Sequence, residues 1–243
     1  MNAKSLTILA VVILLASCAP QAPVQEVSKT IPTFDYQPPS RNPVDSASVS
    51  FALVNPQFPE SWKSMLNVYP FDKFSKNMAT DFEEILSARG FRLRGPFRTY
   101  DELTFPDKSE SDLILTPKIE IDLMGAGQTV VSKDLLGSIS YKWKGTVNLG
   151  GRISINLNES LSKERMWTKS IELPSKSIPY ESKKSAEPIV WGNIPDPELN
   201  NLIANILQEY YLTTMDKVWT YLDPKEMALV KQQAQTIKEK KRY

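Results

Sequence analysis

Residues 146–158 read Thr-Val-Asn-Leu-Gly-Gly-Arg-Ile-Ser-Ile-Asn-Leu-Asn, the strongest strand pattern in the chain. Aliphatic side chains alternate with polar ones along it, so one face is apolar and the other polar. The apolar positions are Val147, Leu149, Ile153, Ile155 and Leu157. Residues 158–164 form a polar hairpin loop, after which residues 167–173 return on a partner strand. Such a two-faced hairpin is typical of an antiparallel or mixed sheet with helices on one side.

Further strands are expected before this hairpin. Residues 49–53 alternate between apolar and small polar side chains, and residues 91–94 make a short strand. Residues 112–123 alternate again but contain Pro117, which indicates an edge position or a bulge because proline cannot donate to a ladder. Residues 125–145 carry several glycines and no clear period, so we expect a long, less regular connection there.

Helices are expected in three places. Residues 71–86 carry one apolar stripe at three- and four-residue spacing. Asp196-Pro197 and Asp223-Pro224 are good helix starts, opening a long amphipathic helix and a last helix. We expect a polar loop over 175–195 and a solvated basic tail over 238–242. The predicted fold class is α+β: a mixed or antiparallel sheet of about five strands, helices packed on one face, and a C-terminal helical pair.

The N-terminus holds a second decisive stretch, Leu15-Ala16-Ser17-Cys18, which closes an apolar run beginning at Leu6. Cys18 is the only cysteine in the chain. The run has the length of a secretory signal core and is too short to cross a bilayer of ~30 Å as a helix. It predicts a signal peptide over 1–17, cleaved between Ser17 and Cys18. The alternative is an ordinary soluble secreted protein with a chance cysteine.

A branched aliphatic residue, two small residues and a cysteine resemble the lipobox of bacterial lipoproteins. The resemblance implies a diacylglyceryl group on the thiol of Cys18 and an acyl chain on its new amine. Two or three chains, at ~0.8 kcal/mol per buried methylene, anchor a protein stably. Ala19 after the cysteine implies sorting to the outer membrane. Proline-rich residues 18–45 would form a lipidated tether reaching ~80 Å at ~3.1 Å per residue, followed by a single domain over 46–243.

Charge and composition exclude several classes of function. Loss of Lys4 with the signal leaves 28 acidic and 28 basic residues, so no long-range field attracts nucleic acid. Histidine is absent and the thiol is taken by lipid, which removes histidine-dependent catalysis and thiolate or imidazole zinc sites. We therefore expect no metal and no cofactor beyond the covalent lipid.

Two constellations could still suggest an enzyme. Ser160 and Lys163 have Ser-x-x-Lys spacing, but they fall in a predicted hairpin tip where nothing would depress the lysine pKa. Glu120 and Asp122 share one strand face, but Lys118 beside them favours a solvated charged surface. We therefore expect no catalytic residues and a protein that is not an enzyme.

Several strings in one order resemble the neuraminyllactose-binding haemagglutinin (adhesin A, flagellar sheath adhesin) lipoprotein family. They lie at 51–58, 84–91, 145–173 and 199–209. The resemblance implies an outer-membrane lipoprotein, surface-exposed or on a flagellar sheath, that acts as an adhesin for sialylated glycans. The family's basic motif Lys-Arg-Thr-Ile-Gln-Lys-Lys is replaced here by residues 128–133, with a single lysine, so glycan binding does not carry over on that motif.

Two binding functions stay open. An adhesin would need a cation for the sialic-acid carboxylate and an aromatic plane for the sugar, and Lys142-Trp143-Lys144 is the best local candidate. The same alternation equally suits a core tryptophan between solvated lysines. A periplasm-facing accessory lipoprotein would instead bind an envelope protein complex. The expected partners are the membrane, through the lipid anchor, and either a host glycan or an envelope protein; the oligomeric state stays open.

Overall fold

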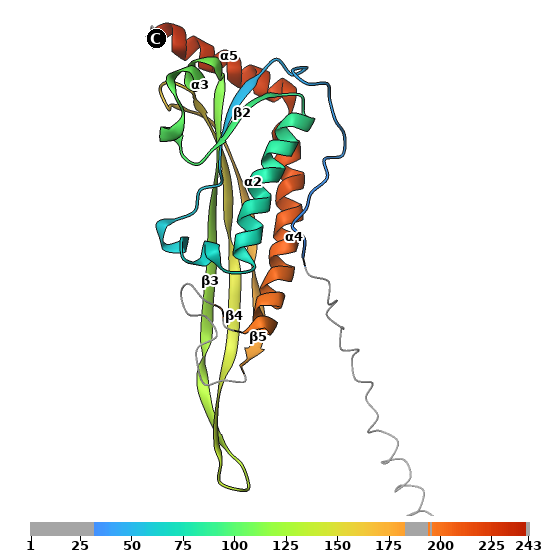
Figure 1. Ribbon diagram of the computed structural model, residues 1–243, viewed down its shortest axis with the longest axis vertical. Helices are drawn as coiled ribbons and strands as arrows, with labels where there is room; N and C mark the ends of the chain where they lie inside the picture. Colours follow the sequence, from blue (N-terminus) through green and yellow to red (C-terminus); the bar gives the residue numbers. More distant parts are fainter. Residues whose placement is uncertain (1–31, 183–193, 195, 242–243) are drawn as a thin grey trace, which may run out of the picture. The chain divides into compact units, whose positions relative to one another are not determined.

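The structure is a computed structural model that describes residues 32–182, 194 and 196–241. Figure 1 shows how its elements are arranged. The strands are β1 (Ser50–Val54), β2 (Arg92–Phe97), β3 (Leu113–Lys133), β4 (Ile139–Glu159) and β5 (Arg165–Glu181). The α-helices are α2 (Phe71–Ala88), α3 (Phe105–Glu110), α4 (Pro197–Tyr221) and α5 (Pro224–Lys241). The short 3-10 helices are η1 (Glu60–Trp62), η2 (Met65–Asn67) and η3 (Tyr100–Glu102).

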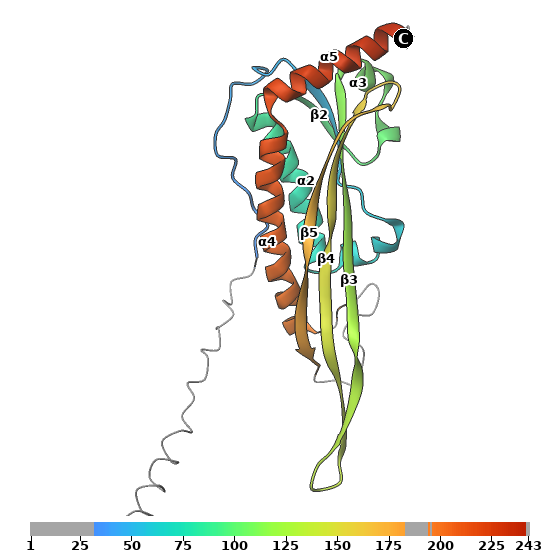
Figure 2. The same cartoon turned by 180° about the vertical axis from the view of Figure 1, so that it is seen from behind.

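Within these described residues, five strands form a mixed sheet in the order β2-β1-β3-β4-β5. β1 runs parallel to β2 and β3, whereas β3, β4 and β5 are antiparallel neighbours. α2 and α4 cover the same face of the sheet, as Figures 1 and 2 show from opposite sides. The predicted α+β class, with its five-stranded sheet, helices on one face and C-terminal helical pair α4 and α5, is confirmed.

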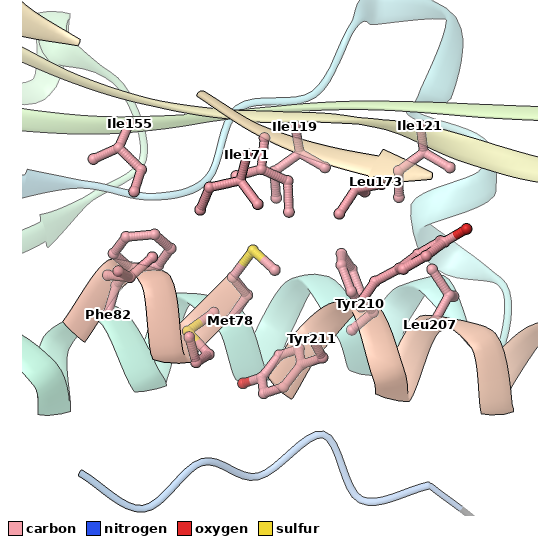
Figure 3. Close-up of a cluster of buried hydrophobic side chains, with 14 of the residues drawn as sticks. Met78, Phe82, Ile119, Ile121, Ile155, Ile171, Leu173, Leu207, Tyr210 and Tyr211 are labelled. Carbon is pink, nitrogen blue, oxygen red and sulfur yellow. The ribbon is translucent and has the colours of Figure 1, made fainter. Parts of the chain in front are cut away.

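The core lies between the sheet and the two covering helices. Figure 3 shows the side chains that meet there: Ile119, Ile121, Ile155, Ile171 and Leu173 from the strands, and Met78, Phe82, Leu207 and Tyr210 from the helices, with Tyr211 on the opposite side of the helix layer. The predicted apolar stripe of α2 is at most 1% exposed at all six positions, Phe71, Phe74, Met78, Phe82, Ile85 and Leu86. Since burying such a side chain contributes about 1.5–3 kcal/mol, α2 is held by tertiary packing more than by helix propensity.

Both C-terminal helices begin where the sequence predicted. The carboxylate of Asp196 accepts a hydrogen bond from the backbone N–H of Glu198 (2.8 Å) and caps α4. The carboxylate of Asp223 accepts the N–H groups of Lys225 (2.9 Å) and Glu226 (3.2 Å) at the start of α5. These bonds satisfy N–H groups that the first turn of a helix otherwise leaves unpaired.

The predicted tether extends too far along the chain. Residues 32–45, which we call the strap, run along the helix layer on the side away from the sheet, as the blue chain in Figure 3 shows. Phe34 is fully buried, and its ring centroid lies 5.8 Å from that of Phe74 and 5.7 Å from that of Tyr211. Its N–H donates to the side chain of Gln208 (2.9 Å). The domain therefore includes the strap, and the predicted start at residue 46 is wrong.

The predicted irregular connection over 125–145 is also wrong. β3 and β4 stay paired up to Lys133 opposite Ile139, so these residues form a regular hairpin, which we call the arm. Figure 1 shows the arm extending beyond the end of β5. Gly127 pairs with Gly145, and a Cβ on either would lie 2.5 or 2.7 Å from the ring of Trp143. The tryptophan covers this glycine pair and leaves no room for a larger residue.

Pro117 lies in an interior strand, not at a sheet edge. β1 pairs with β3 only as far as Leu115. Beyond it, Gln57 forms an isolated bridge and donates its N–H to the carbonyl of Pro117 (2.9 Å). Since the N–H and C=O of a strand residue point the same way, the missing donor of Pro117 faces the side on which β1 has ended. The constraint that predicted an edge is met locally.

The polar loop predicted over 175–195 is wrong in its first part. β5 continues to Glu181 and stays paired with β4 there. The remainder of that loop, residues 183–193 and 195, lies outside the described residues.

A buried carboxylate joins α2 to α4. Asp81 is 4% exposed, and it accepts a hydrogen bond from the hydroxyl of Tyr211 (2.5 Å). Burial raises the pKa of Asp81 from 3.8 to about 6, although the hydrogen bond from Tyr211 lowers it. Because burial disfavours the charged form, the ionised carboxylate is a source of instability at neutral pH.

Asp81→Asn should stabilise the domain at pH 7 by about 1–2 kcal/mol, since the amide still accepts from Tyr211 without a buried charge. The acid's folded-state pKa lies above its unfolded value, so stability is greatest below pH ~4 and falls as the pH rises through about 6. Urea denaturation at several pH values checks this. The variant should lack this part of the decline; parallel curves for the two proteins would contradict the assignment.

Candidate functional site

The predicted ligand site, Lys142-Trp143-Lys144, lies on β4 within the arm. Trp143 is 5% exposed, and its ring packs on the glycine pair and lies 6.3 Å from the ring of Tyr180. The amine of Lys142 lies 3.0 Å from Glu181. This hydrogen bond, with the charges of Lys142 and Lys144, holds the pKa of Glu181 below its ordinary value. The buried ring offers no open face to a sugar, so the geometry fits the core-tryptophan interpretation.

Ser160 and Lys163 lie in the turn between β4 and β5, and each has partners of its own. Ser160 is fully buried, and its hydroxyl donates to the carbonyl of Ser111 (2.8 Å). The amine of Lys163 lies 3.7 Å above the ring of Tyr100 and 3.4 Å from a carboxylate oxygen of Asp101. Both side chains thus hold the turn against neighbouring loops.

Glu159 at the same turn is a buried charge that sequence reasoning missed. It is fully buried and accepts the N–H groups of Leu161 (3.0 Å) and Ser162 (2.5 Å). The amine of Lys238 lies 3.6 Å away. Burial would raise the pKa of Glu159, but these hydrogen bonds and the charge of Lys238 outweigh it and lower the pKa. Its stabilising contribution is therefore present at neutral pH and is lost as the pH falls through that lowered pKa.

The basic end of α5 is exposed at residues 239–241, as predicted, but the helix also makes ion pairs that the sequence did not predict. Lysines of α5 form a row of ion pairs with one acid just before β3 and two acids at the β4–β5 turn: Lys231 with Asp112 (3.0 Å), Lys238 with Glu159 (3.6 Å) and Lys241 with Glu164 (3.1 Å). Spacings of seven and three residues place the three amines on one helix face. This spacing is the feature of the sequence from which the row could have been predicted. The row fastens α5 to the turns at one end of the sheet.

Glu120 and Asp122 line a cleft of about 500 Å³, together with Arg152 and Glu172. Both Nε and one terminal nitrogen of Arg152 donate to Glu120 (3.2 and 2.6 Å). This is the charged, exposed strand face that the sequence favoured, with Arg152 as the partner of Glu120.

A second cleft, of about 400 Å³, lies between β1, β2 and α5. Its cations, Arg92 and Lys231, each lie 3.0 Å from a carboxylate, Asp45 and Asp112 respectively. The cations lining both clefts are therefore already paired, and a sialic-acid carboxylate would have to compete with a protein carboxylate for them.

Ser17 and Cys18 lie outside the described residues. Among the residues the structure describes, no three His, Cys, Asp or Glu side chains gather as a metal site. In that same part of the chain, no helix is long and apolar enough to cross a membrane.

An apolar turn at the end of the arm is the surface feature that sequence reasoning missed. Leu135 and Leu136 are 105% and 93% exposed. Asp134 and Gly137 flank them, and an Asp and a Gly on either side of a pair of leucines are turn residues that signal a hairpin tip.

No family model matches the chain, and no curated protein matches it. Among solved structures, the chain is similar to a neuraminyllactose-binding hemagglutinin homolog from Helicobacter pylori, at a TM-score of 0.56 and 14% identity. That match covers 84% of this chain and 97% of the other. It shows a shared fold, which is the part of the sequence resemblance that the comparison confirms.

Two lipoproteins are similar at lower TM-scores. A minor lipoprotein from Acinetobacter baumannii has a TM-score of 0.33 and 8% identity, with 73% of this chain and 92% of that chain covered. The rare lipoprotein B from Shewanella oneidensis has a TM-score of 0.32 and 11% identity, with 73% and 98% covered.

Proposed function

We propose that this chain is a lipid-anchored lipoprotein of the bacterial outer membrane whose folded domain binds a partner at the cell envelope. The observation that carries the proposal is Leu15-Ala16-Ser17-Cys18 at the end of a signal-like apolar run, with the only cysteine of the chain at the site of lipidation. The fold shared with the hemagglutinin homolog supports a binding role. Lipidation would hold the domain at a membrane, and the domain would act by contact.

Contact in place of catalysis is part of this proposal. The chain has no histidine, and its Ser160 and Lys163 are each engaged in holding a turn. Catalysis needs a nucleophile, a base and an orienting group within hydrogen-bond reach of one another. The cations that line the two clefts are paired with protein carboxylates, which suits a structural or binding surface.

We place the domain on the cell surface as an adhesin, with a sialylated glycan as the first ligand to test. The resemblance in sequence strings and the shared fold both point to the hemagglutinin homolog. A sialylated glycan would meet the exposed side chains of Lys142 and Lys144 on the arm, where its carboxylate would compete with Glu181 for Lys142.

A second candidate is a periplasm-facing accessory lipoprotein that binds an envelope protein complex. The paired cations of both clefts favour it, because a protein surface can exchange partners with a row of ion pairs, whereas a sialic acid needs an available cation. The two candidates differ in which side of the outer membrane the domain faces.

Trypsin added to intact cells should cut the domain if it is on the surface. The side chain of Lys163, in the β4–β5 turn at the other end of the sheet from the arm, is 56% exposed, so Lys163 is a favourable cleavage site. Mass spectrometry of released fragments identifies the cut, and a periplasmic protein that stays intact is the control. Protection of Lys163 in intact cells, with cleavage after outer-membrane permeabilisation, would contradict the surface location and favour the accessory role.

The ligand is tested separately with the purified chain from Ala19 to Tyr243. We expect it to bind sialylated glycans more tightly than the same glycans after sialidase treatment. Lys142→Gln with Lys144→Gln should reduce that preference, and Lys217→Gln on α4 is the matched control. Equal binding to both glycan sets would remove sialic acid from the proposal and leave the lipid anchor untouched.

A further inference from the structure

The arm carries an apolar surface that the domain leaves uncovered. Odd-numbered residues of β3 and β4 face the helices inside the domain, where Ile121, Leu123 and Leu149 are buried. The same face continues along the arm past the helices, with Val131 opposite Tyr141 and Lys133 opposite Ile139. Val131, Ile139 and Tyr141 are 59%, 56% and 49% exposed. This face ends in Leu135 and Leu136, the most exposed of the large apolar side chains in the described part of the chain.

The turn at the end of the arm is closed by its own hydrogen bonds. The carboxylate of Asp134 accepts the N–H groups of Leu136 (2.9 Å) and Ser138 (2.8 Å). The N–H of Asp134 donates to the carbonyl of Ser138 (3.0 Å), and that of Gly137 to the carbonyl of Asp134 (3.1 Å). The two leucines are therefore presented outward on a closed turn, in which the N–H groups of Asp134, Leu136, Gly137 and Ser138 all have acceptors.

The charges of the arm are mainly positive, although Lys142 is paired with Glu181 of β5 (3.0 Å). Residues 124–145 contain three lysines, Lys133, Lys142 and Lys144, and a single acid, Asp134. The acid is occupied in the turn. An apolar tip with an aromatic residue and lysines behind it is the arrangement of segments that lie in the interface of an anionic bilayer.

The N-terminal segment is long enough for the lipid on Cys18 to reach as far as the tip of the arm. The strap contacts Gln208 of α4. The neighbouring Tyr210 donates its hydroxyl to the carbonyl of Leu149, which pairs with Leu123, so the start of the strap and Leu123 lie at a similar level along the sheet. From Leu123 to Lys133 the arm covers ten positions, about 34 Å at ~3.4 Å per residue. From Cys18 to Pro32 the chain has fourteen positions, about 43 Å at ~3.1 Å per residue. A lipid on Cys18 and the tip of the arm can therefore reach the same bilayer.

We propose that the tip of the β3–β4 arm inserts Leu135 and Leu136 into the surface of the bilayer that holds the lipid anchor. This inference rests on the proposed lipid anchor, because the membrane is the occupant that the anchor places within reach. Insertion would give the domain a second, non-covalent contact with the membrane. It would also fix the orientation of the domain, so that the opposite end of the sheet, with α5 and its row of ion pairs, points away from the lipid.

The single cysteine makes a direct test possible. In the lipidated full chain Cys18 is blocked, so Leu136→Cys supplies the free thiol for an environment-sensitive nitrobenzoxadiazole label. Leu229→Cys on α5 is the matched control, since Leu229 is also an exposed leucine, at 61%. Both labelled proteins are placed in vesicles of phosphatidylethanolamine and phosphatidylglycerol.

We expect nitroxide groups on the lipid acyl chains to quench the label at position 136 several-fold more than the label at 229, and iodide in the water to do the reverse. Equal access of iodide to both positions would overturn the inference. Shielding from iodide without quenching by nitroxide would also overturn it, because it would mean that protein covers the tip. If the unsubstituted full chain itself takes up label at Cys18, the lipid anchor fails and not the arm.

A second measurement does not depend on the label. The unlipidated chain from Ala19 to Tyr243 carrying both Leu135→Ser and Leu136→Ser should partition into the same vesicles about tenfold less than the unsubstituted chain, equivalent to about 1.4 kcal/mol. Leu229→Ser should change partitioning little. Unaltered partitioning of the double variant, with an unaltered circular dichroism spectrum for both proteins, would contradict insertion.

Discussion

Phe34→Ala should lower the free energy of unfolding by about 3–5 kcal/mol, the cost typical of removing a fully buried phenylalanine. Phe34 is 0% exposed, and its ring packs edge to face against Phe74 and at a tilt against Tyr211. Truncation would leave a cavity between α2 and α4 that the strap cannot refill, and it would also release the strap from the helix layer. Urea denaturation of the purified chain followed by circular dichroism measures the change.

Val44→Ala is the matched control for this prediction. Val44 lies in the same strap but is 83% exposed, so its truncation should change stability by less than about 0.5 kcal/mol. Similar effects from the two substitutions would mean that the strap is a loose tether, as the sequence alone had predicted, and not part of the domain.

Cys18→Ser should abolish attachment of acyl chains to the protein. Serine has no thiol to alkylate, and cleavage after Ser17 should fail with the alkylation, leaving a heavier precursor. Each acyl chain contributes ~0.8 kcal/mol per buried methylene, and the variant would lose every chain at once. The expected effect on membrane anchoring is therefore complete. Incorporation of radiolabelled palmitate in a Gram-negative host, followed by gel electrophoresis, measures both consequences.

Ser17→Ala is the control within the same motif, because it keeps a small residue before the cysteine. That variant should be labelled and cleaved normally. Palmitate incorporation by Cys18→Ser would place the lipid on another residue and would contradict the proposed anchor.

Periodicity predicted the elements that bury one continuous face. The alternation along 146–158 and the stripe from Phe71 to Leu86 each face the core, so composition and position agree. The helix starts at Asp196 and Asp223 were predicted because capping is a local interaction, decided by neighbouring residues.

Sequence patterns did not predict the elements that lack one continuous buried face. The arm is exposed on both sides past the helices, so nothing selects an alternation, and only backbone pairing defines its strands. The strap is held by Phe34 and Tyr36, two aromatic residues among prolines, and isolated anchors have no period to detect. The ion pairs of α5 reach residues far away along the chain, as Lys231 does with Asp112, which no local pattern encodes.

The candidate site could be predicted only in outline. Lys142-Trp143-Lys144 fits a sugar site and a core tryptophan equally well in sequence, and the choice depends on the glycine pair that Trp143 covers across the hairpin. The buried Glu159 and the exposed Leu135 and Leu136 were missed for the same reason, since a charge in a turn normally faces water and leucines normally face the core.

Mass spectrometry of the N-terminal peptide of the native protein tests the central claim most directly. The account predicts that the mature chain begins at Cys18 and that this residue carries a diacylglyceryl group on sulfur and an acyl chain on its amine. A mature N-terminus with a free thiol at Cys18, or a chain that begins elsewhere and fractionates as a soluble protein, would contradict it.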